Sequence, residues 1–458
     1  MEYNIVIGGG ITGLFSAHTL QKRMPKTPVI IVEAAPQIGG LLKSKYYKSH
    51  GAFDYGIHAF YETGIAEIDE YFLGLPIDWT FLTGYERDLG GAAWKTRVNY
   101  DAPYLDVTSD ENQNRYFDEM QTIINCEEDG TPKLNSQDWL SSRFGTSLTQ
   151  NYLAEAIEAR QHQPAKDVHW LAAMVQGLGR VVACDENTVL KNYKNPHFSK
   201  RLAFPNQRNY PIDILPDRRS YYPKNIGIGQ VINAIGKDLT RRGVSILTSA
   251  KIVHAKSAPN KVESVDILHN DGKMRCFDVK NIVCSAPLPA FLFSLEKKPP
   301  PQAFKPPHQT VICNFISKTR PKDGDLYYIF LHGHPRLHRV SFPYNYSEEN
   351  LDRRGGYPFC VEAVYPRGED ATAAADLALS GLVEANIISD PADILFQDSY
   401  VSSGGYPNMS IGNIKALEFY RKYVSDMNLS NLKSVGVLSR ESLFFQFDLI
   451  KHANDILI

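Results

Sequence analysis

The sequence predicts an α/β fold in which a parallel-sheet domain is interrupted by a mixed α+β domain that carries a helical cap. A short apolar run at 4–7 leads directly into a glycine-rich turn at 8–13, which is typical of a buried strand that ends in a tight turn. Further buried-strand patterns follow at 243–247 and 281–285, and helical periodicity occupies much of 115–202. This order indicates a chain that leaves a sheet and returns to it after an insertion.

The glycine-rich turn has the spacing G-x-G-x-x-G that dinucleotide-binding proteins use. Gly8 permits the tight turn, Gly10 lets the backbone approach a pyrophosphate, and Gly13 lets the following helix pack close to the sheet. The N–H groups and positive end of that helix are the expected pyrophosphate site. Glu33 follows a second apolar run at 29–32, twenty residues beyond Gly13, where a carboxylate can accept a hydrogen bond from a ribose 2′-OH. The alternative, a glycine turn without a ligand, is disfavoured by this context, and NADP is disfavoured because the carboxylate repels a 2′-phosphate.

Composition indicates a globular protein of more than one domain. A chain of 458 residues is too long for one ordinary core and suggests two or three domains, and 43% hydrophobic with 22% charged residues is typical of globular proteins. The 49 basic and 51 acidic residues leave a net charge of −2, which argues against a broad nucleic-acid surface. We therefore expect no nucleic-acid partner, and composition predicts no oligomeric state.

Cysteine usage and hydropathy indicate the cellular compartment. Six scattered cysteines without a C-x-x-C pair fit free thiols in a reducing compartment. The chain begins with a predicted strand, which leaves no room for a signal peptide, and no apolar run approaches the roughly 20 residues that span a bilayer. We expect a cytoplasmic protein without a membrane span. No cluster has metal-ligand spacing and no G-x-S-x-G nucleophile elbow is present, so metalloenzyme and hydrolase functions are disfavoured.

Periodicity predicts most of the other elements. Helical spacing occurs at 65–72, 231–239, 373–385, 411–427 and 448–456, besides four helices of the cap, the last of them at 170–178. Strand patterns occur within 78–107 and at 262–268, 274–279, 311–316, 327–331, 337–342, 359–365 and 432–437. Asn270-Asp271-Gly272 predicts a hairpin turn. The stretch 187–219 has little periodicity and many Pro, Asn and Arg residues, so it is predicted to be a long loop.

The stretch after Glu33 resembles a known group of flavoproteins. Five residues separate Glu33 from Gly39-Gly40, as in the extended FAD fingerprint of the amine oxidase, protoporphyrinogen oxidase and UDP-galactopyranose mutase group. The segment 56–60 is similar to the Gly-x-His-x-Phe segment that passes the flavin in that group. Further segments that resemble the group, in the same order, are 222–229, 284–289, 337–343 and 359–362. The resemblance implies FAD as the cofactor and a glutathione-reductase-type, Rossmann-like domain with an inserted substrate domain.

Several positions depart from the group's pattern. Leu41 stands where members often carry Arg, and Arg440 is displaced by three positions from the place next to Gly436 where the group has Gly-Arg. Asp448 stands about where the group's Asp opens the last helix. The segment 158–164 lacks the Lys-x-Trp pattern with which the mutases hold a uridine diphosphate sugar, so an ordinary UDP-galactopyranose mutase is not expected.

The resemblance and the returning strands together predict two discontinuous domains. The FAD-binding domain is expected to comprise 1–75, 221–295 and 430–458. The substrate domain is expected to comprise 76–220 and 296–429, with the helical insertion at about 115–202.

The resemblance also implies a set of site residues. The expected cofactor-binding residues are Gly8, Gly10, Ile11, Thr12, Gly13, Glu33, Ala34, Gly39, Gly40, Leu41, Gly56, Ile57, His58, Ile252, Ser285, Gly436 and Asp448. The expected substrate-binding residues are Phe60, Tyr61, Tyr328, His338 and Arg339. His58 is the expected catalytic residue, and no metal site is expected.

His58 and Arg339 carry the chemical hypothesis. A neutral imidazole at His58 can hydrogen-bond a flavin atom or a substrate hydroxyl, or take a proton near neutral pH; the alternative is a histidine that serves packing only. Arg339 can hold a phosphate or carboxylate through two donors, and the alternative is a surface arginine paired to Glu362. Because a strand alternates its faces, His338 and Arg339 are expected to point in opposite directions.

The expected function is that of an FAD-dependent oxidoreductase that transfers a hydride between flavin and a polar small-molecule substrate, such as a nucleotide sugar or an amine. Two alternatives remain open. One is a flavin-dependent sugar pyranose/furanose mutase with no net redox change. The other is a non-catalytic dinucleotide-binding protein, which the altered Gly436 segment suggests.

Overall fold

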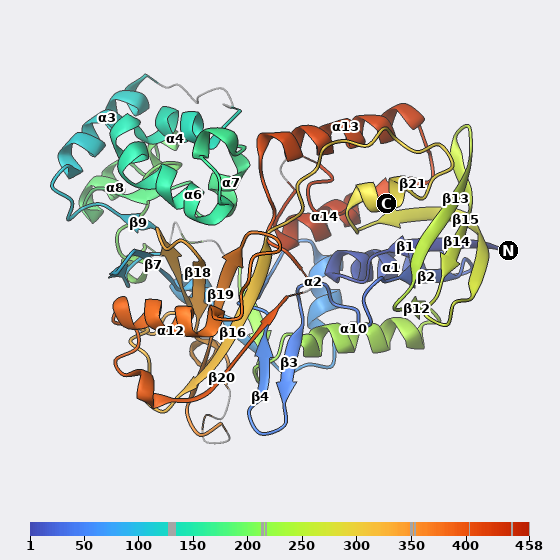
Figure 1. Ribbon diagram of the computed structural model, residues 1–458, viewed down its shortest axis with the longest axis horizontal. Helices are drawn as coiled ribbons and strands as arrows, with labels where there is room; N and C mark the ends of the chain where they lie inside the picture. Colours follow the sequence, from blue (N-terminus) through green and yellow to red (C-terminus); the bar gives the residue numbers. More distant parts are fainter. Residues whose placement is uncertain are drawn as a thin grey trace.

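A largely parallel sheet of seven strands holds the glycine-rich turn at the end of its first strand (Figure 1). The structure is a computed structural model, and it describes residues 1–126, 134–211, 215, 218–348, 351, 354–402, 404–440 and 443–457. The strand order is β12–β2–β1–β15–β14–β13, and β21 pairs with β15. The strands are β1 (Glu2–Ile7), β2 (Val29–Val32), β12 (Ser245–Leu247), β13 (Lys251–Ala258), β14 (Lys261–Leu268), β15 (Met274–Cys284) and β21 (Leu432–Ser434). The predicted return of the chain to its first sheet is thereby confirmed.

The central strands of this sheet are buried on both faces, which explains their unbroken apolar sequence. Ile5 and Ile30 belong to the core on one face, whereas Val6 and Ile31 belong to the core on the other. The helices on the second of these faces are α1 (Ile11–Arg23), α10 (Gly229–Arg241) and α14 (Gln446–Ile456). The helices whose side chains join the first core are α11 (Leu288–Leu292) and α13 (Ile411–Met427). The sheet is therefore a middle layer with apolar cores above and below it.

A second sheet of seven strands lies beside the first, in the order β20–β16–β19–β18–β17–β7–β8 (Figure 1). Its strands are β7 (Gly90–Trp94), β8 (Arg97–Asn99), β16 (Gln309–Ser317), β17 (Tyr328–His332), β18 (Leu337–Ser341), β19 (Tyr357–Tyr365) and β20 (Ile394–Val401), and α12 (Ala374–Glu384) packs on it. All neighbours are antiparallel except β17 and β7. The sequence reading missed β20, because this edge strand mixes polar and apolar residues without a continuous apolar run.

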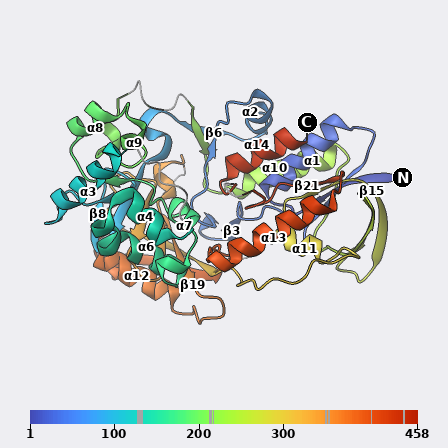
Figure 2. The same cartoon turned by 90° about the horizontal axis from the view of Figure 1, so that it is seen from above.

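Helices from the segment after β9 (Leu105–Asp106) form a cap above the second sheet (Figure 1), and Figure 2 shows the same helices beside one end of α13. They are α3 (Gln113–Asn125), α4 (Ser136–Phe144), α5 (Thr146–Leu148), the π-helical turn η2 (Thr149–Leu153), α6 (Ala154–Gln161), α7 (Leu171–Val175), α8 (Glu186–Asn192) and α9 (Pro196–Ser199). Fully buried Leu140, Leu148 and Ile157 show that the cap has its own core.

The prediction of a long loop at 187–219 was wrong for its first half, which contains most of α8 and all of α9, and the second half contains the 3₁₀ turn η4 (Gln207–Asn209). Asp185 and Asn195 cap α8 and α9 by accepting hydrogen bonds from the N–H groups of Thr188 and His197. The capping residues can be recognised in the sequence, but the helices are too short to show an apolar periodicity. The helix expected at 170–178 is also shorter, since α7 ends at Val175.

Small elements connect the two large sheets. Three strands form one small sheet, in the order β5 (Phe60–Tyr61), β11 (Ser220–Pro223) and β6 (Trp79–Leu82). Other elements are the hairpin β3 (Ser44–Tyr47) with β4 (Gly51–Asp54), the pair β9 (Leu105–Asp106) with β10 (Val181–Val182), α2 (Ala66–Leu73), and the 3₁₀ turns η1 (Gly84–Asp88), η3 (Ala165–Asp167), η6 (Pro343–Asn345) and η8 (Pro391–Asp393). Within the described ranges, no helix has the length and apolar character that crossing a membrane requires.

Asp54 ties the β3–β4 hairpin to β11 and to the start of α10. Its buried carboxyl accepts hydrogen bonds from Ser44 Oγ (2.6 Å), Tyr222 OH (2.5 Å) and the N–H of Ile228 (2.8 Å). Burial raises the pKa of Asp54 from 3.8 to about 6, although these three donors act in the opposite direction. The carboxyl therefore makes a pH-dependent connection between the β3–β4 hairpin, β11 and the start of α10.

We expect the stability of the wild-type protein to fall, relative to Asp54→Asn, as the pH rises from about 4 to about 7. A carboxyl whose pKa is raised to about 6 in the folded state keeps a proton that the unfolded chain has released above 3.8, so its contribution to folding is lost over that interval. The change is about 3 kcal/mol, since one pKa unit corresponds to about 1.4 kcal/mol. Urea unfolding of both proteins at each pH measures it, and a stability difference independent of pH would contradict the assignment.

Candidate functional site

A cavity of about 820 Å³ lies where the carboxyl end of the first sheet meets the second sheet. The glycine-rich turn contributes Gly10, Ile11 and Thr12 to its wall, and the predicted substrate residues Phe60, Tyr61, Tyr328, His338 and Arg339 line it as well. The cap reaches the cavity through Val175 of α7. The structure thus brings together the expected pyrophosphate site and the expected substrate site.

The three motif glycines differ in their surroundings. A Cβ added at Gly13 would overlap the carbonyl oxygen of Gly8, and one added at Gly8, which has φ of +100°, would lie 2.7 Å from Ser285 Oγ. A Cβ added at Gly10 has no protein atom nearer than Gly40 Cα, at 3.9 Å. Gly8 and Gly13 are therefore required by packing, whereas Gly10 leaves open space on the cavity side. Such a cradle fits a dinucleotide pyrophosphate.

Glu33 is held at the end of β2. Its Oε2 accepts a hydrogen bond from the N–H of Gly9 (2.6 Å) and its Oε1 from the N–H of Ala35 (2.7 Å). A carboxylate oxygen can accept more than one hydrogen bond, so both oxygens retain capacity for a ribose hydroxyl. Glu33 and the exposed Ala34 lie next to the turn but outside the wall of the large cavity.

The second glycine pair, Gly39-Gly40, is hydrogen-bonded to the glycine-rich turn. Gly39 has φ of +122° and donates its N–H to the carbonyl oxygen of Gly9 (2.7 Å), and Gly40 has φ of +59°. Gly39 and the half-exposed Leu41 line the cavity, whereas Gly40 faces Gly10. The fingerprint stretch is therefore fixed beside the turn, and Leu41 presents an apolar surface where the flavoprotein group often has Arg.

The remaining expected cofactor residues divide into two groups. Ser285 lines the cavity and donates its hydroxyl to the carbonyl oxygen of Ile7 (2.9 Å), and Gly436 packs so closely that an added Cβ would lie 2.8 Å from Ser285 O. Asp448 lies in the first turn of α14, outside the cavity wall that its neighbours Phe447 and Leu449 line. Ile252 lies on β13, also outside that wall.

The segment from Gly56 to His58 runs along the cavity as expected. Gly56 has φ of +95°, and a Cβ there would lie 2.5 Å from the Glu362 carboxyl group, so only glycine fits. Ile57 and His58 line the cavity, and His58 Nε2 is buried without a hydrogen-bond partner in the described part of the chain. Burial, assisted by the nearby charge of Arg339, lowers the pKa of His58 to about 4. The imidazole is therefore neutral at neutral pH, and its Nε2 has an unused hydrogen-bonding capacity.

Arg339 and Glu362 form an ion pair in the cavity wall. Arg339 Nε donates to Glu362 Oε1 at 2.8 Å, and Arg339 Nη2 lies 2.7 Å from the same oxygen. The pairing expected for a surface arginine is thus present, but both residues line the cavity instead of the outer surface. Arg339 Nη1 has no hydrogen bond or ion pair to the described residues, so the guanidinium can still donate to a ligand.

The expectation that His338 and Arg339 point in opposite directions was wrong, because both line the cavity. The pairing of β18 with β19 shifts between Leu337 and Arg339, so His338 lies in an irregular step of the strand. A β-bulge of this kind breaks the alternation of faces. The sequence pattern alone contains no signal for such a step.

Sequence reasoning missed an acidic group on the cavity wall. The carboxyl of Asp88, an exposed residue at the end of η1 that lines the cavity, has side-chain hydrogen bonds with Tyr328 and Tyr61, and desolvation raises its pKa. Next to it, the guanidinium of Arg87 lies 5.0 Å from the centre of the Tyr61 ring. Nothing in the local sequence marks Asp88, because its partners come from strands far away in the chain. Among the described residues, no group of three or more His, Cys, Asp or Glu side chains could hold a metal ion.

Comparisons with known proteins agree with this architecture. Residues 6–71 match the family model of the NAD(P)-binding Rossmann-like domain, and no curated protein matches the chain. The fold is similar to that of reduced UDP-galactopyranose mutase, with a TM-score of 0.71, 15% identity, and coverage of 100% of this chain and 93% of that one.

Two further solved structures extend this similarity. A protein from Exiguobacterium sp. 255-15 described as a protoporphyrinogen oxidase has a TM-score of 0.61 and 12% identity, with 100% and 98% of the two chains covered. A putrescine oxidase mutant has a TM-score of 0.60 and 14% identity, with 99% and 97% covered. These similarities confirm the predicted α/β fold and the predicted resemblance at the level of the fold.

We expect Glu362→Gln to lower the free energy of unfolding by about 3–5 kcal/mol, because it leaves the buried charge of Arg339 without its partner. The double variant Arg339→Met/Glu362→Gln is expected to recover most of that loss, since it removes both charges. Urea unfolding measures both effects, with the exposed Glu70→Gln on α2 as the control. Equal destabilisation in the single and double variants would show that the ion pair is not the cause.

Proposed function

We propose that this protein is an FAD-dependent oxidoreductase that transfers a hydride between flavin and a polar small-molecule substrate. One observation carries the proposal: the open cradle at Gly10 and the side chains of His58 and Arg339 face the same cavity. A dinucleotide bound at the turn would therefore extend toward a wall that holds polar groups suited to a substrate. The fold shared with an oxidase and a mutase supports this proposal.

FAD fits the residues present better than a dinucleotide confined to the turn. The N–H groups at the start of α1 would hold the pyrophosphate, and Glu33 would hold the ribose. Beyond the turn, Leu41, Val437 and Phe445 line the cavity, and they are 46–50% exposed. They therefore offer an apolar surface on which the flavin ring system could pack. When bound, FAD supplies the capacity to accept or donate a hydride.

Two groups on the cavity wall would handle protons and hydrogen bonds. Because its pKa is lowered to about 4, His58 is suited to hydrogen-bonding a substrate hydroxyl or the cofactor through Nε2 rather than to taking up a proton. Asp88 differs from His58, since desolvation raises its pKa whereas the hydrogen bonds with the hydroxyls of Tyr328 and Tyr61 lower it. Asp88 is therefore a second group on this wall that can exchange a proton with a substrate.

The charges of the wall limit the substrate. Arg339 is paired with Glu362, and Arg87 lies beside Asp88, so the described residues give the cavity no excess of cations. A diphosphate would need such an excess, whereas a polar molecule with hydroxyl or amine groups would not. A polar substrate of this second kind, held among tyrosine side chains, fits the wall best.

A second candidate function is a flavin-dependent sugar mutase without net redox change. The whole-chain similarity to reduced UDP-galactopyranose mutase, at a TM-score of 0.71, favours it. The two functions differ in their need for electrons. Oxygen uptake or reduction of an added acceptor with candidate sugars and amines would support the oxidoreductase. An isomerised product that forms only after prior reduction of the flavin would support the mutase.

The absorption spectrum of the purified, undialysed protein tests the proposal directly. We expect a flavin spectrum, with FAD released on denaturation. A colourless protein that also fails to take up added FAD would overturn the flavoenzyme proposal and leave a non-catalytic dinucleotide-binding protein as the better account.

The variant Gly10→Ala is expected to lower the FAD content by at least about tenfold without lowering thermal stability of the cofactor-free protein. Its added Cβ enters open space in the protein but occupies the place where the pyrophosphate would approach. Gly412→Ala on α13 is the matched control, because a Cβ there meets no atom within 4 Å and lies outside the cavity. Normal FAD content in Gly10→Ala would place the cofactor elsewhere.

A further inference from the structure

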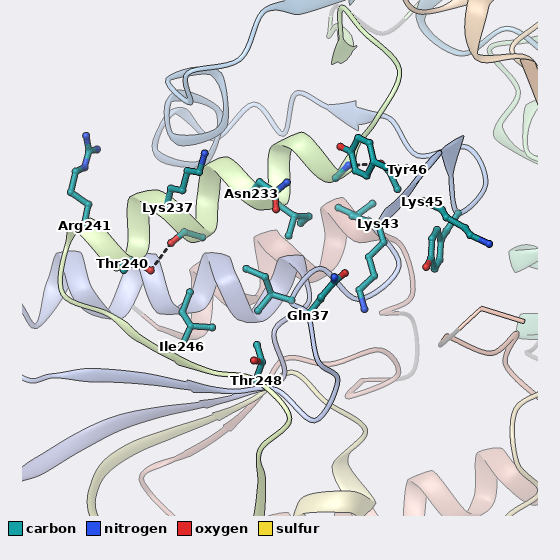
Figure 3. Close-up of a pocket in the computed structure, with 17 residues that line it drawn as sticks. Gln37, Lys43, Lys45, Tyr46, Asn233, Lys237, Thr240, Arg241, Ile246 and Thr248 are labelled. Carbon is teal, nitrogen blue, oxygen red and sulfur yellow. Dashed lines mark hydrogen bonds between the residues drawn. The ribbon is translucent and has the colours of Figure 1, made fainter. Parts of the chain in front are cut away.

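A second cavity, of about 1060 Å³, lies along α10 and is bordered by the segment 37–46 and by β12 (Figure 3). We call it the α10 groove. None of the residues of the glycine-rich turn at 8–13 lines it, and neither does Glu33. The groove shares only Leu42 and Tyr55 with the cavity described above. It is therefore a separate site with a common wall.

The α10 groove carries a concentrated positive charge. Its lining contains Lys43, Lys45, Lys237 and Arg241 but no Asp or Glu, whereas the whole chain has 49 basic and 51 acidic residues. Such a one-sided lining raises the local concentration of anions. The charge balance here differs from that of the first cavity, where each arginine has an acidic neighbour.

Two of the four cations are available to a ligand. Lys45 is paired with Asp398 at 2.7 Å, and Arg241 with Asp238 at 2.7 Å. Lys43 and Lys237 have no ion pair or side-chain hydrogen bond with any residue that the structure describes. The ammonium groups of these two lysines are thus free to bind anions. Figure 3 shows Lys237 directed away from Lys43, so each would contact a different part of a ligand.

The rest of the lining is suited to a ring-bearing ligand. Figure 3 shows Lys43 directed toward the region of Gln37 and Thr248, and Tyr46 beside the first turn of α10. The Tyr46 side chain is exposed (60% for the residue) and can offer its face to a planar group. Apolar Ile246 and polar Asn233 complete the lining between the two ends. The groove therefore combines free cations with an exposed aromatic ring.

We propose that the α10 groove binds a nucleotide, with its phosphates held by Lys237 and its base or other planar ring against Tyr46. Flexible lysine ammonium groups bind phosphate as point charges, and an aromatic face accepts any planar base. The site is distinct from the dinucleotide cradle, because none of residues 8–13 takes part in it. The proposal does not depend on the oxidoreductase function.

Calorimetric titration of the FAD-loaded protein at low salt with ADP, inorganic pyrophosphate and adenosine tests the proposal. We expect ADP to bind more tightly than either probe that carries only one of its two parts, and to bind more weakly as salt is added. Lys237→Glu is expected to weaken ADP binding by at least about tenfold. Lys415→Glu on α13 is the matched control, because it makes the same charge change on an exposed helix position outside the groove.

Two further variants separate the parts of the site. Tyr46→Ser is expected to weaken ADP binding and to leave pyrophosphate binding unchanged, since it removes only the ring surface. Gly10→Ala is expected to leave ADP binding unchanged while FAD content falls, which separates failure of this proposal from failure of the flavin proposal.

Four outcomes would overturn the nucleotide site. They are no heat with ADP at millimolar concentration, release of FAD by ADP, equal weakening in Lys237→Glu and Lys415→Glu, and equal affinity for ADP and pyrophosphate with no effect of Tyr46→Ser. The last result would instead indicate a site for inorganic phosphate groups alone.

Discussion

Close packing of the first turn against the end of β15 is the constraint on which the rest of this molecule depends. Gly13 has no room for a side chain above the carbonyl oxygen of Gly8, and Gly8 lies against Ser285 with a positive φ. Glycine at both positions lets α1 begin directly at the carboxyl edge of the sheet. The free N–H groups of the helix then face a cavity instead of being covered by side chains. Every other feature of the site is arranged around that opening.

Charge pairing determines the character of the wall opposite the turn. Glu362 neutralises Arg339, and the hydroxyls of Tyr61 and Tyr328 hydrogen-bond the carboxyl of Asp88. Buried charges are costly unless they are paired, so the wall is polar without a large net charge. His58 and Tyr406 both line this cavity, and each has a buried polar atom without a hydrogen-bond partner among the described residues. Such a wall offers directed hydrogen bonds rather than a strong net charge.

The two cavities differ in charge but share a wall. Leu42 and Tyr55 line both of them, and the segment that carries Leu42 also joins Gly39 to the lysines of the α10 groove. None of residues 8–13 lines the groove, so a nucleotide bound there would leave the dinucleotide cradle unobstructed. Each cavity can therefore be occupied independently of the other.

The sequence by itself determined the elements whose signals are local. The strand, glycine turn, helix and acid from Glu2 to Glu33 follow from apolar runs and spacing, and so do the return strands and the hairpin near Gly272. Tertiary structure decided what depends on residues distant in the chain. The step in β18 placed His338 and Arg339 on one cavity, and packing of η1 under β17 brought Asp88 to Tyr328. The free lysines of the α10 groove were likewise hidden, because neither a fold pattern nor a motif reports which cations lack a partner. Local sequence encodes periodicity and turn geometry, whereas burial and charge pairing are properties of the assembled chain.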